Sequence, residues 1–244
     1  AHIMRVLEPV WHTKAETASR LRGRLEAVLD WATVHRYRTG DNPARWKGHL
    51  DALLPARSKV AKSKHFAALP WRDMKPFMAE LRQQSGIGAL ALQFTILTAA
   101  RSGEVRGMAW YEVDFEHKLW TVPGERMKAG KEHRVPLSDA AMQLLESLKD
   151  TKLADTDIVF PSTRDHKPLS DMTLTAVLRR MKRDDITVHG FRSSFRDWAA
   201  EATDYPQEMA LAHIVGNKVE AAYRRGDMLE KRRAMMQAWA EHSL

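Results

Sequence analysis

The 244-residue sequence has no cysteine, no long apolar run and no secretion signal. Without cysteine the chain cannot form a disulfide, use a thiol nucleophile or bind a metal through sulfur, so a reducing cytoplasm is the expected compartment. No apolar run approaches the roughly 20 residues that span a bilayer, and no signal-peptide segment opens the chain. We therefore expect neither a disulfide scaffold nor a membrane protein.

Several catalytic signatures are also missing. The sequence has no phosphate-binding Gly-x-x-x-x-Gly-Lys-Ser/Thr loop, no His-Glu-x-x-His, no Gly-x-Ser-x-Gly and no dinucleotide fingerprint. Its 11 histidines show no recognisable zinc-ligand spacing. These absences count against nucleotide-driven, metalloprotease and serine-hydrolase activities. We expect no metal and no cofactor.

The positive charge is concentrated in the first third of the chain. Lysine and arginine number 39 against 31 acidic residues, a net charge of +8. Residues 1–70 hold 13 basic and 6 acidic residues, a net of +7, whereas residues 71–244 hold 26 and 25. A basic balance favours polyanionic partners, nucleic acid before an anionic membrane. The asymmetry indicates a basic binding region joined to a near-neutral region with another task.

Sequence patterns divide the chain into three parts. Residues 1–54 are expected to be helical, with a long amphipathic helix over 14–37 and a basic flank. Residues 55–70 are expected to form a basic linker between two prolines, and residues 71–244 a second domain. Residues 1–3 precede a methionine and are left out of this interpretation. The basic side chains that we expect to face DNA phosphates are Arg20, Arg22, Arg24, Arg57, Lys59, Lys62 and Lys64.

The third part is predicted to be mainly α with a small antiparallel β-sheet. Short β-type segments at 113–115, 119–122 and 133–137 are separated by turn residues, which predicts three antiparallel strands. One predicted helix, at 87–99, is almost wholly apolar and is therefore expected to be buried. The other helices are predicted over 72–84, from 102, and near 139–149, 171–182, 189–202, 206–213, 218–223 and 228–240.

Some polar side chains stand in unusual positions within this pattern. Arg101 directly follows the apolar helix in TILTAARSGEV, where a charge is costly unless it is paired, and Glu104 is the simplest partner. His189 and Arg192 lie three residues apart at the start of a predicted helix in HGFRSSFRDW, so their side chains share a face. Taken singly, a buried ion pair, a capping histidine and a surface arginine explain them well.

Three more residues also have ordinary explanations when taken singly. Lys128 lies in a turn between two predicted strands, His213 ends an apolar helical stretch (EMALAHIVG), and Tyr223 lies in KVEAAYRRG. A solvated loop lysine, a core histidine and a packing tyrosine are the simple interpretations. The order and spacing of the whole set, however, are not ordinary.

The set resembles the catalytic domain of the tyrosine recombinases, the phage-type integrases of prophages, genomic islands and satellite phages. The resemblance runs through TAARSGEV, MKAGKEHRVPLS, HGFR, LAH and AAYRRGD and covers about residues 70–240. Residues 4–54 resemble the latter part of the family's core-binding domain. Members of this type usually also carry an arm-binding domain and a complete core-binding domain. We therefore expect this sequence to encode the chemistry but not full recombination.

The resemblance implies a phosphate-binding role for the cationic residues. Arg101 and Arg192 would bind the nonbridging oxygens of a phosphodiester under attack, because fork-shaped guanidiniums suit that charge. His213 would donate a further hydrogen bond. Glu104 would support the site by holding the Arg101 guanidinium.

The resemblance also implies how the strand is cut. Tyr223 would attack to give a 3′-phosphotyrosyl bond and a free 5′-hydroxyl. Lys128 would protonate the departing 5′ oxygen, and His189 would manage the proton of the tyrosine, whose ordinary pKa is ~10. Because the covalent link conserves the bond energy, rejoining needs neither metal nor ATP.

The implied partner is a double-stranded DNA attachment site. The family implies a tetramer on DNA, and we expect a monomer off DNA, no membrane, and a location in the bacterial cytoplasm at the nucleoid. The C-terminal helix (MLEKRRAMMQAWAEH) suits docking on its own domain and docking on a neighbouring protomer equally well, because apolar periodicity does not choose between them.

Two other functions remain open at this point. A type IB topoisomerase resembles this catalytic set, although the size of the chain and the residues around Tyr223 favour an integrase. A non-catalytic DNA-binding module needs only the basic first third. Phosphate contacts would make binding strongly dependent on salt under any of these functions.

Overall fold

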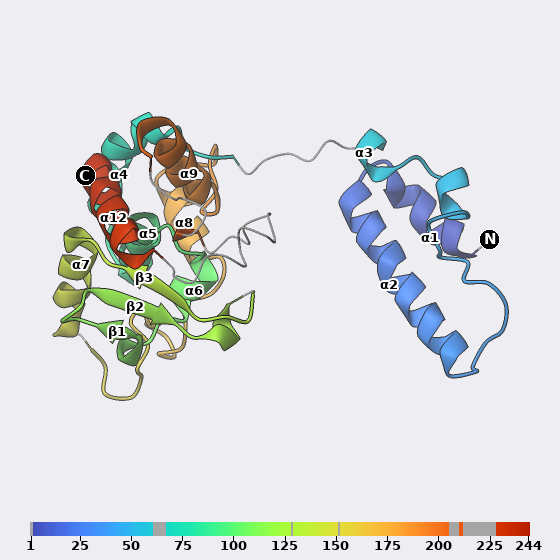
Figure 1. Cartoon of the computed structure of the whole chain (residues 1–244), viewed down its shortest axis with the longest axis horizontal. Coiled ribbons are helices and arrows are strands. Elements are labelled where there is room, and N and C mark those ends of the chain that lie inside the picture. Colours follow the sequence, from blue (N-terminus) through green and yellow to red (C-terminus); the bar gives the residue numbers. More distant parts are fainter. Residues whose placement is uncertain (1, 61–66, 128, 151, 205–209, 212–227) are drawn as a thin grey trace. The chain divides into compact units, whose positions relative to one another are not determined.

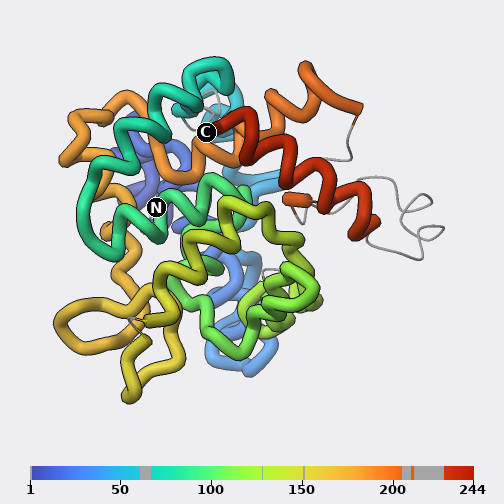
Figure 2. Tube along the Cα trace, turned by 90° about the vertical axis from the view of Figure 1, so that its left-hand side faces the viewer, coloured from blue at the N-terminus to red at the C-terminus, as the bar shows by residue number. Residues whose placement is uncertain are grey.

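The computed structural model describes residues 2–60, 67–127, 129–150, 152–204, 210–211 and 228–244. The chain divides into two compact units, Ala1–His65 (unit 1) and Phe66–Leu244 (unit 2), shown in Figures 1 and 2. Within the described ranges, no helix combines the length and the apolar character that a membrane crossing requires.

Unit 1 is built on two helices that pack side by side, α1 (His2–Trp11) and α2 (Ala15–Val34). Leu7 and Trp11 lie four residues apart and therefore share the buried face of α1. The indole N–H of Trp11 donates to the carbonyl of Pro55 at 2.9 Å, and its ring stacks on another indole. The unit is completed by a 3-10 turn, η1 (Leu50–Ala52), and by a short helix, α3 (Arg57–Val60).

The predicted long helix exists but is shorter at both ends than 14–37. Its only buried residues are Ala15 and Ala18, at its N-terminal end. Val28, Trp31 and Val34, farther along, are all more than half exposed. The core of unit 1 is correspondingly small and consists of Leu7, Trp11, Ala18, Leu50 and Leu54.

Unit 2 is organised around helix α5 (Ile87–Thr98), the helix that the apolar pattern predicted to be buried. Ten of its twelve residues are buried, including Gln93 and both threonines. The hydroxyls of Thr95 and Thr98 donate to carbonyls one turn earlier, which satisfies these polar groups inside the core. The helices that pack on α5 are α4 (Met74–Arg82), α6 (Ser102–Arg106), α7 (Asp139–Lys149), α8 (Thr173–Arg180) and α12 (Leu229–Ser243).

The predicted three-stranded antiparallel sheet is present, in the order β1-β2-β3. The strands are β1 (Val113–Asp114), β2 (Leu119–Val122) and β3 (His133–Pro136), each close to its predicted position. Trp120 pairs with Val135, and both are buried. The expected fold class, mainly α with one small sheet, is therefore confirmed.

The C-terminal helix α12 packs on its own unit, against α4, α5, α7 and β3 (Figures 1 and 2). The indole N–H of Trp239 donates to the carbonyl of Ile96 in α5 at 2.8 Å. The Arg232 guanidinium donates to the main-chain carbonyl of Arg134 in β3. Of the two docking modes that the sequence left open, this structure has the one within a single chain.

The last residues of the predicted linker belong to unit 2. The carbonyl of Ala67 accepts from the main-chain N–H of Thr187 at 3.0 Å. Gly190 lies so close to this segment that a Cβ there would stand 2.2 Å from the Ala67 oxygen. The glycine of HGFR therefore allows helix α9 (Gly190–Ala202) to begin against residues 67–69.

Candidate active site

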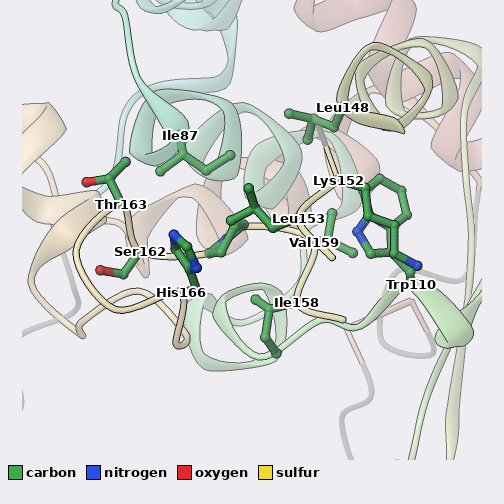
Figure 3. Close-up of a pocket in the computed structure, with 11 residues that line it drawn as sticks. Ile87, Trp110, Leu148, Lys152, Leu153, Ile158, Val159, Ser162, Thr163 and His166 are labelled. Atoms are coloured by element: carbon green, nitrogen blue, oxygen red, sulfur yellow. The ribbon is translucent and has the colours of Figure 1, made fainter. Parts of the chain in front are cut away.

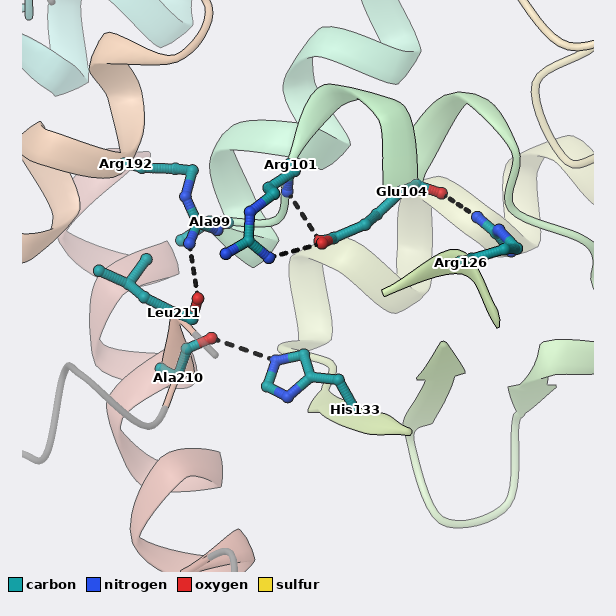
Figure 4. A network of polar contacts seen from close by, with 8 residues as sticks. All are labelled: Ala99, Arg101, Glu104, Arg126, His133, Arg192, Ala210 and Leu211. Carbon is teal, nitrogen blue, oxygen red and sulfur yellow. Dashed lines mark hydrogen bonds and ion pairs between the residues drawn. The ribbon is translucent and has the colours of Figure 1, made fainter. Parts of the chain in front are cut away.

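The structure describes four of the predicted catalytic and supporting residues: Arg101, Glu104, His189 and Arg192. Figure 4 shows a polar network that includes Arg101 at the N-cap of α6, Glu104 in α6 and Arg192 in α9. The other predicted residues lie outside the described ranges: Lys128, His213 and Tyr223.

Arg101 is held where one helix ends and the next begins. Helix α5 stops at Ala99, whose φ of +49° is in the left-handed region that turns the chain sharply. Arg101 then occupies the N-cap of α6, and both carboxylate oxygens of Glu104 bind it. One accepts from the Arg101 main-chain N–H at 2.9 Å and the other from Nη1 at 2.7 Å. The carboxylate is buried, whereas the Arg101 side chain stays 28% exposed.

Arg192 is almost completely buried, with 6% of its surface exposed. Its guanidinium donates through Nη1 to the carbonyl of Ala99 and through Nη2 to the carbonyl of Leu211, at 2.6 Å for the latter. Each of these carbonyls lies two residues before another predicted site residue, Arg101 in one case and His213 in the other. Arg192 therefore ties together the main chain of two sequence motifs that are far apart along the chain.

His189 stands at the N-cap of α9, one turn before Arg192, and is exposed. Its position follows from the close packing of Gly190 on Ala67 described above. The structure thus places His189 and Arg192 at the same end of α9, with the histidine exposed and the arginine buried.

Sequence reasoning missed His133, at the start of β3. Its Nε2 lies 3.3 Å from the carbonyl oxygen of Ala210, next to the carbonyl that Arg192 holds (Figure 4). Burial lowers the pKa of His133 to about 4, and the positive charges of Arg232 and Arg192 act in the same direction, against Glu104. His133 is therefore neutral near pH 7.

Arg126 was missed as well. It belongs to a 3-10 turn, η4 (Gly124–Arg126), and its guanidinium donates both to the Glu112 carboxylate and to the main-chain carbonyl of Glu104. Arg126 and His133 flank Lys128 in ERMKAGKEH, where basic side chains are expected to be solvated turn residues. In the fold, however, Arg126 contacts a residue 22 positions away and His133 contacts one 77 positions away. Both side chains are partly buried in these contacts.

The candidate DNA-facing residues of unit 1 differ in their surroundings. Arg20 and Arg57 share the Glu16 carboxylate, and both are substantially exposed. Arg22 is only 16% exposed; it pairs with Glu26 and donates to the carbonyl of Ala44 at 3.0 Å. Among these candidates, the described ones that are exposed and have no carboxylate partner are Arg24 and Lys59. Lys62 and Lys64 lie outside the described residues.

A cavity of about 280 Å³ lies away from this network (Figure 3). Its lining includes Ile87, at the N-terminal end of α5, together with Trp110, Leu153 and Ile158. The twelve residues of α5 rise about 18 Å, and Arg101 follows the opposite end of that helix. Where the structure describes the chain, no cluster of three or more histidine or acidic residues is placed to hold a metal.

Comparison with known sequences identifies the family of both units. The phage integrase family matches residues 69–227, and the phage integrase central domain matches residues 1–49. The integrase of Enterobacteria phage P4 is 33% identical over 94% of this chain and 55% of its own length. Prophage integrase IntA of Escherichia coli K12 is 38% identical over 60% of this chain and 36% of its own length. The chain spans about half the length of the curated relatives it matches.

Solved structures share the fold. A lambda integrase tetramer bound to a Holliday junction matches with a TM-score of 0.63 and 21% identity, covering 88% of this chain and 64% of the other. The Tn1549 transposon integrase in complex with circular intermediate DNA matches with a TM-score of 0.59 and 14% identity, covering 91% and 78%. At these identities the likeness supports the fold alone. Because the family match at residues 69–227 spans more than half of the sequence, this chain belongs to the phage integrase family.

Proposed function

We propose that this chain is the cleaving and rejoining part of a site-specific DNA recombinase, with Tyr223 as its nucleophile. The observation that carries the proposal is the network around Arg192, which joins the main chain before Arg101 to the main chain before His213. Two permanently cationic side chains are thereby fixed near each other, and the buried carboxylate of Glu104 holds one of them, Arg101. Family membership supports the same conclusion.

The two arginines bind and polarise the phosphate. Glu104 orients Arg101 through two hydrogen bonds and leaves the side chain of Arg101 partly exposed, so that a phosphate oxygen can bind there. Preorganised donors of this kind stabilise the charge that develops on the nonbridging oxygens and need no rearrangement during the reaction. His213 supplies a further hydrogen bond in this proposal.

Cleavage exchanges one phosphodiester for another. The phenolic oxygen of Tyr223 attacks phosphorus, the bond from phosphorus to O5′ breaks, and a 3′-phosphotyrosyl link remains. Lys128 gives a proton to the departing O5′, while His189 takes the proton of the tyrosine. In the reverse direction a 5′-hydroxyl attacks the link and releases Tyr223. Conservation of the bond energy means that rejoining requires no ATP.

The partner in this proposal is a double-stranded DNA attachment site. Solved relatives bound to DNA, including the lambda integrase tetramer on a Holliday junction, support a tetramer on DNA. We propose a monomer in the absence of DNA and a location in the bacterial cytoplasm, at the nucleoid. Unit 1 and the linker hold nearly all of the excess positive charge and supply the phosphate contacts.

Covalent capture from a mixed pool tests this function even though the attachment-site sequence is unidentified. The protein is incubated with nicked duplexes of randomised sequence, and complexes that survive denaturing detergent are isolated and sequenced. We expect the wild type to capture a recurring duplex and Tyr223→Phe to capture none. Absence of any adduct with the wild type, or an adduct with Tyr223→Phe, overturns the proposal.

Two further assays with the same protein distinguish the other candidate functions. A type IB topoisomerase, which the family match does not favour, would relax a plasmid that lacks the captured sequence. A non-catalytic DNA-binding module would retain duplexes in a filter-binding assay yet form no adduct that survives detergent. We expect salt-dependent binding together with adduct formation, and no relaxation of such a plasmid.

A further inference from the structure

The connection between β2 and β3, residues 123–132, contains Lys128. One side chain before this lysine and one after it are tied to other parts of unit 2. Arg126 lies two residues before Lys128, and His133 lies five residues after it. Neither side chain has a part in the proposed chemistry. Each one instead binds a main-chain carbonyl of a segment that contains another site residue.

The first tie joins the connection to α6. Arg126 donates to the carbonyl of Glu104, the residue whose carboxylate holds Arg101. Its guanidinium is fixed in this direction because it also binds the Glu112 carboxylate, which is 1% exposed. The other oxygen of Glu112 accepts from the indole of Trp120 at 2.9 Å. A planar guanidinium can hold a carboxylate and a carbonyl together, whereas a lysine ammonium is a single point charge.

The second tie joins the end of the connection to the segment before His213. The carbonyl of Ala210 can only accept, so His133 must carry its proton on Nε2. The adjacent carbonyl, that of Leu211, is held by Arg192 from α9. Two consecutive carbonyls are thus held by two different elements, one by the strand that follows Lys128 and one by the helix that contains Arg192.

We propose that Arg126 and His133 are positioning residues, which hold the β2–β3 connection, and Lys128 with it, in reach of the scissile phosphate. The inference rests on the proposed function, because it takes Lys128 as the proton donor to O5′. Proton transfer requires a distance of about 2.6–3.2 Å between heavy atoms, and a misplacement of about 1 Å can slow a reaction by ~10²-fold. Loss of either tie should therefore slow protonation of O5′ and leave phosphate binding by Arg101 intact.

A change of leaving group isolates this effect. In the captured duplex, sulfur replaces the bridging 5′ oxygen at the cleavage position, so that the bond from phosphorus to sulfur breaks and a thiolate departs. A thiol has a pKa of ~8.5, far below that of an alcohol, so the thiolate needs no proton from Lys128. Adduct formation is then timed for each protein with the oxygen and the sulfur duplex.

We expect Arg126→Lys and His133→Leu to slow cleavage of the oxygen duplex by roughly 10- to 100-fold. On the sulfur duplex both variants should come within about threefold of the wild type. His133→Gln keeps a neutral N–H donor and should recover part of the lost rate on the oxygen duplex. The matched controls are Arg164→Lys and His117→Leu, the same substitutions at exposed positions, and they should behave as wild type.

Two reference variants keep this inference separate from the proposed function. Lys128→Ala should recover on the sulfur duplex, and Arg101→Lys should not, because sulfur does not replace a phosphate ligand. Failure of the wild type on both duplexes, or failure of Lys128→Ala to recover, contradicts the proposed function itself. If the reference variants behave as expected while Arg126→Lys and His133→Leu are equally slow on both duplexes, or unaffected on both, the positioning role is wrong.

Discussion

The arginines around the site of unit 2 differ from the exposed arginines of unit 1. In unit 2, Arg192, Arg126 and Arg232 are mostly buried and donate to main-chain carbonyls, so each fixes the path of the backbone. In unit 1, Arg20 and Arg57 are exposed and share one glutamate. Exposed ion pairs contribute little to stability, about 0–1 kcal/mol, whereas buried carbonyls that lose their donor are costly. The buried arginines thus shape the site in unit 2, whereas the exposed ones add positive charge to the surface of unit 1.

The largest expected effect on activity comes from removing Arg192. In Arg192→Ala the buried carbonyls of Ala99 and Leu211 both lose a donor, which should lower the free energy of unfolding by about 2–4 kcal/mol. Loss of a phosphate donor should also slow adduct formation by ~10²-fold or more. Urea unfolding and covalent capture measure the two losses. Arg196→Ala, half exposed on the same helix, is the matched control and should change the unfolding free energy by less than about 0.5 kcal/mol.

Truncation of a tryptophan compares the cores of the two units. Trp239 is fully buried under α5, so Trp239→Ala should lower the unfolding free energy of unit 2 by about 3–5 kcal/mol. Trp31 in unit 1 is more than half exposed, and Trp31→Ala should lose less than about 1 kcal/mol. Hydrogen exchange measured peptide by peptide should show faster exchange in unit 2 for the first variant. Equal losses in both variants would contradict the contrast between the cores.

Acid should weaken unit 2 through His133. The pKa of this histidine is lowered to about 4 in the folded chain from an ordinary value of 6.5. Between those two pH values the unfolded chain binds a proton that the folded chain does not, so stability falls as pH falls through this range. The loss attributable to His133 is at most about 3 kcal/mol.

Thermal or urea unfolding at several pH values checks this slope. Because other groups also titrate, the relevant quantity is the difference between wild type and His133→Leu. We expect the variant to lose less stability than the wild type as the pH falls from 6.5 to about 4. Parallel curves for the two proteins would show that His133 does not have the depressed pKa.

The smallest expected effects distinguish two arginines of one helix. Arg24 is exposed on α2, so Arg24→Ala should weaken DNA binding severalfold and reduce the salt slope by about one unit, with little change in stability. Arg22 packs against Trp46 and donates to Ala44, so Arg22→Ala should lower the unfolding free energy of unit 1 by about 1–2 kcal/mol. DNA binding at several salt concentrations and urea unfolding separate the two. Equal salt slopes for both variants would remove the distinction.

Much of the fold could be predicted because it depends on local patterns. The almost wholly apolar sequence of α5 predicted a buried helix, and the three strands lie close to their predicted positions. Residues 1–54 were expected to be helical, but no separate helix was predicted at the position of α1, because residues 1–3 were left out of the interpretation and Pro9 interrupts the helical pattern. Leu7 and Trp11 nevertheless supply much of the core of unit 1.

In the candidate site too, contacts between neighbours in the sequence could be predicted, and contacts between distant residues could not. Glu104 could be proposed as the partner of Arg101 because the two are one helical turn apart. The partners of Arg192, 93 and 19 residues away, leave no local pattern, and neither do those of Arg126 and His133. Arg22 and Arg24 look alike in the sequence, and only the fold shows that the first is largely buried. Burial of a charged side chain depends on what packs over it, and local periodicity does not contain that information.

The central claim is that a phosphate held by Arg101 and Arg192 is attacked by Tyr223. Mass spectrometry of peptides from a captured protein–DNA adduct tests it most directly. We predict a nucleotide attached through its 3′-phosphate to the peptide that contains Tyr223, and to no other peptide. A nucleotide on a different residue, or no modified peptide from a protein that binds the duplex, would contradict the claim.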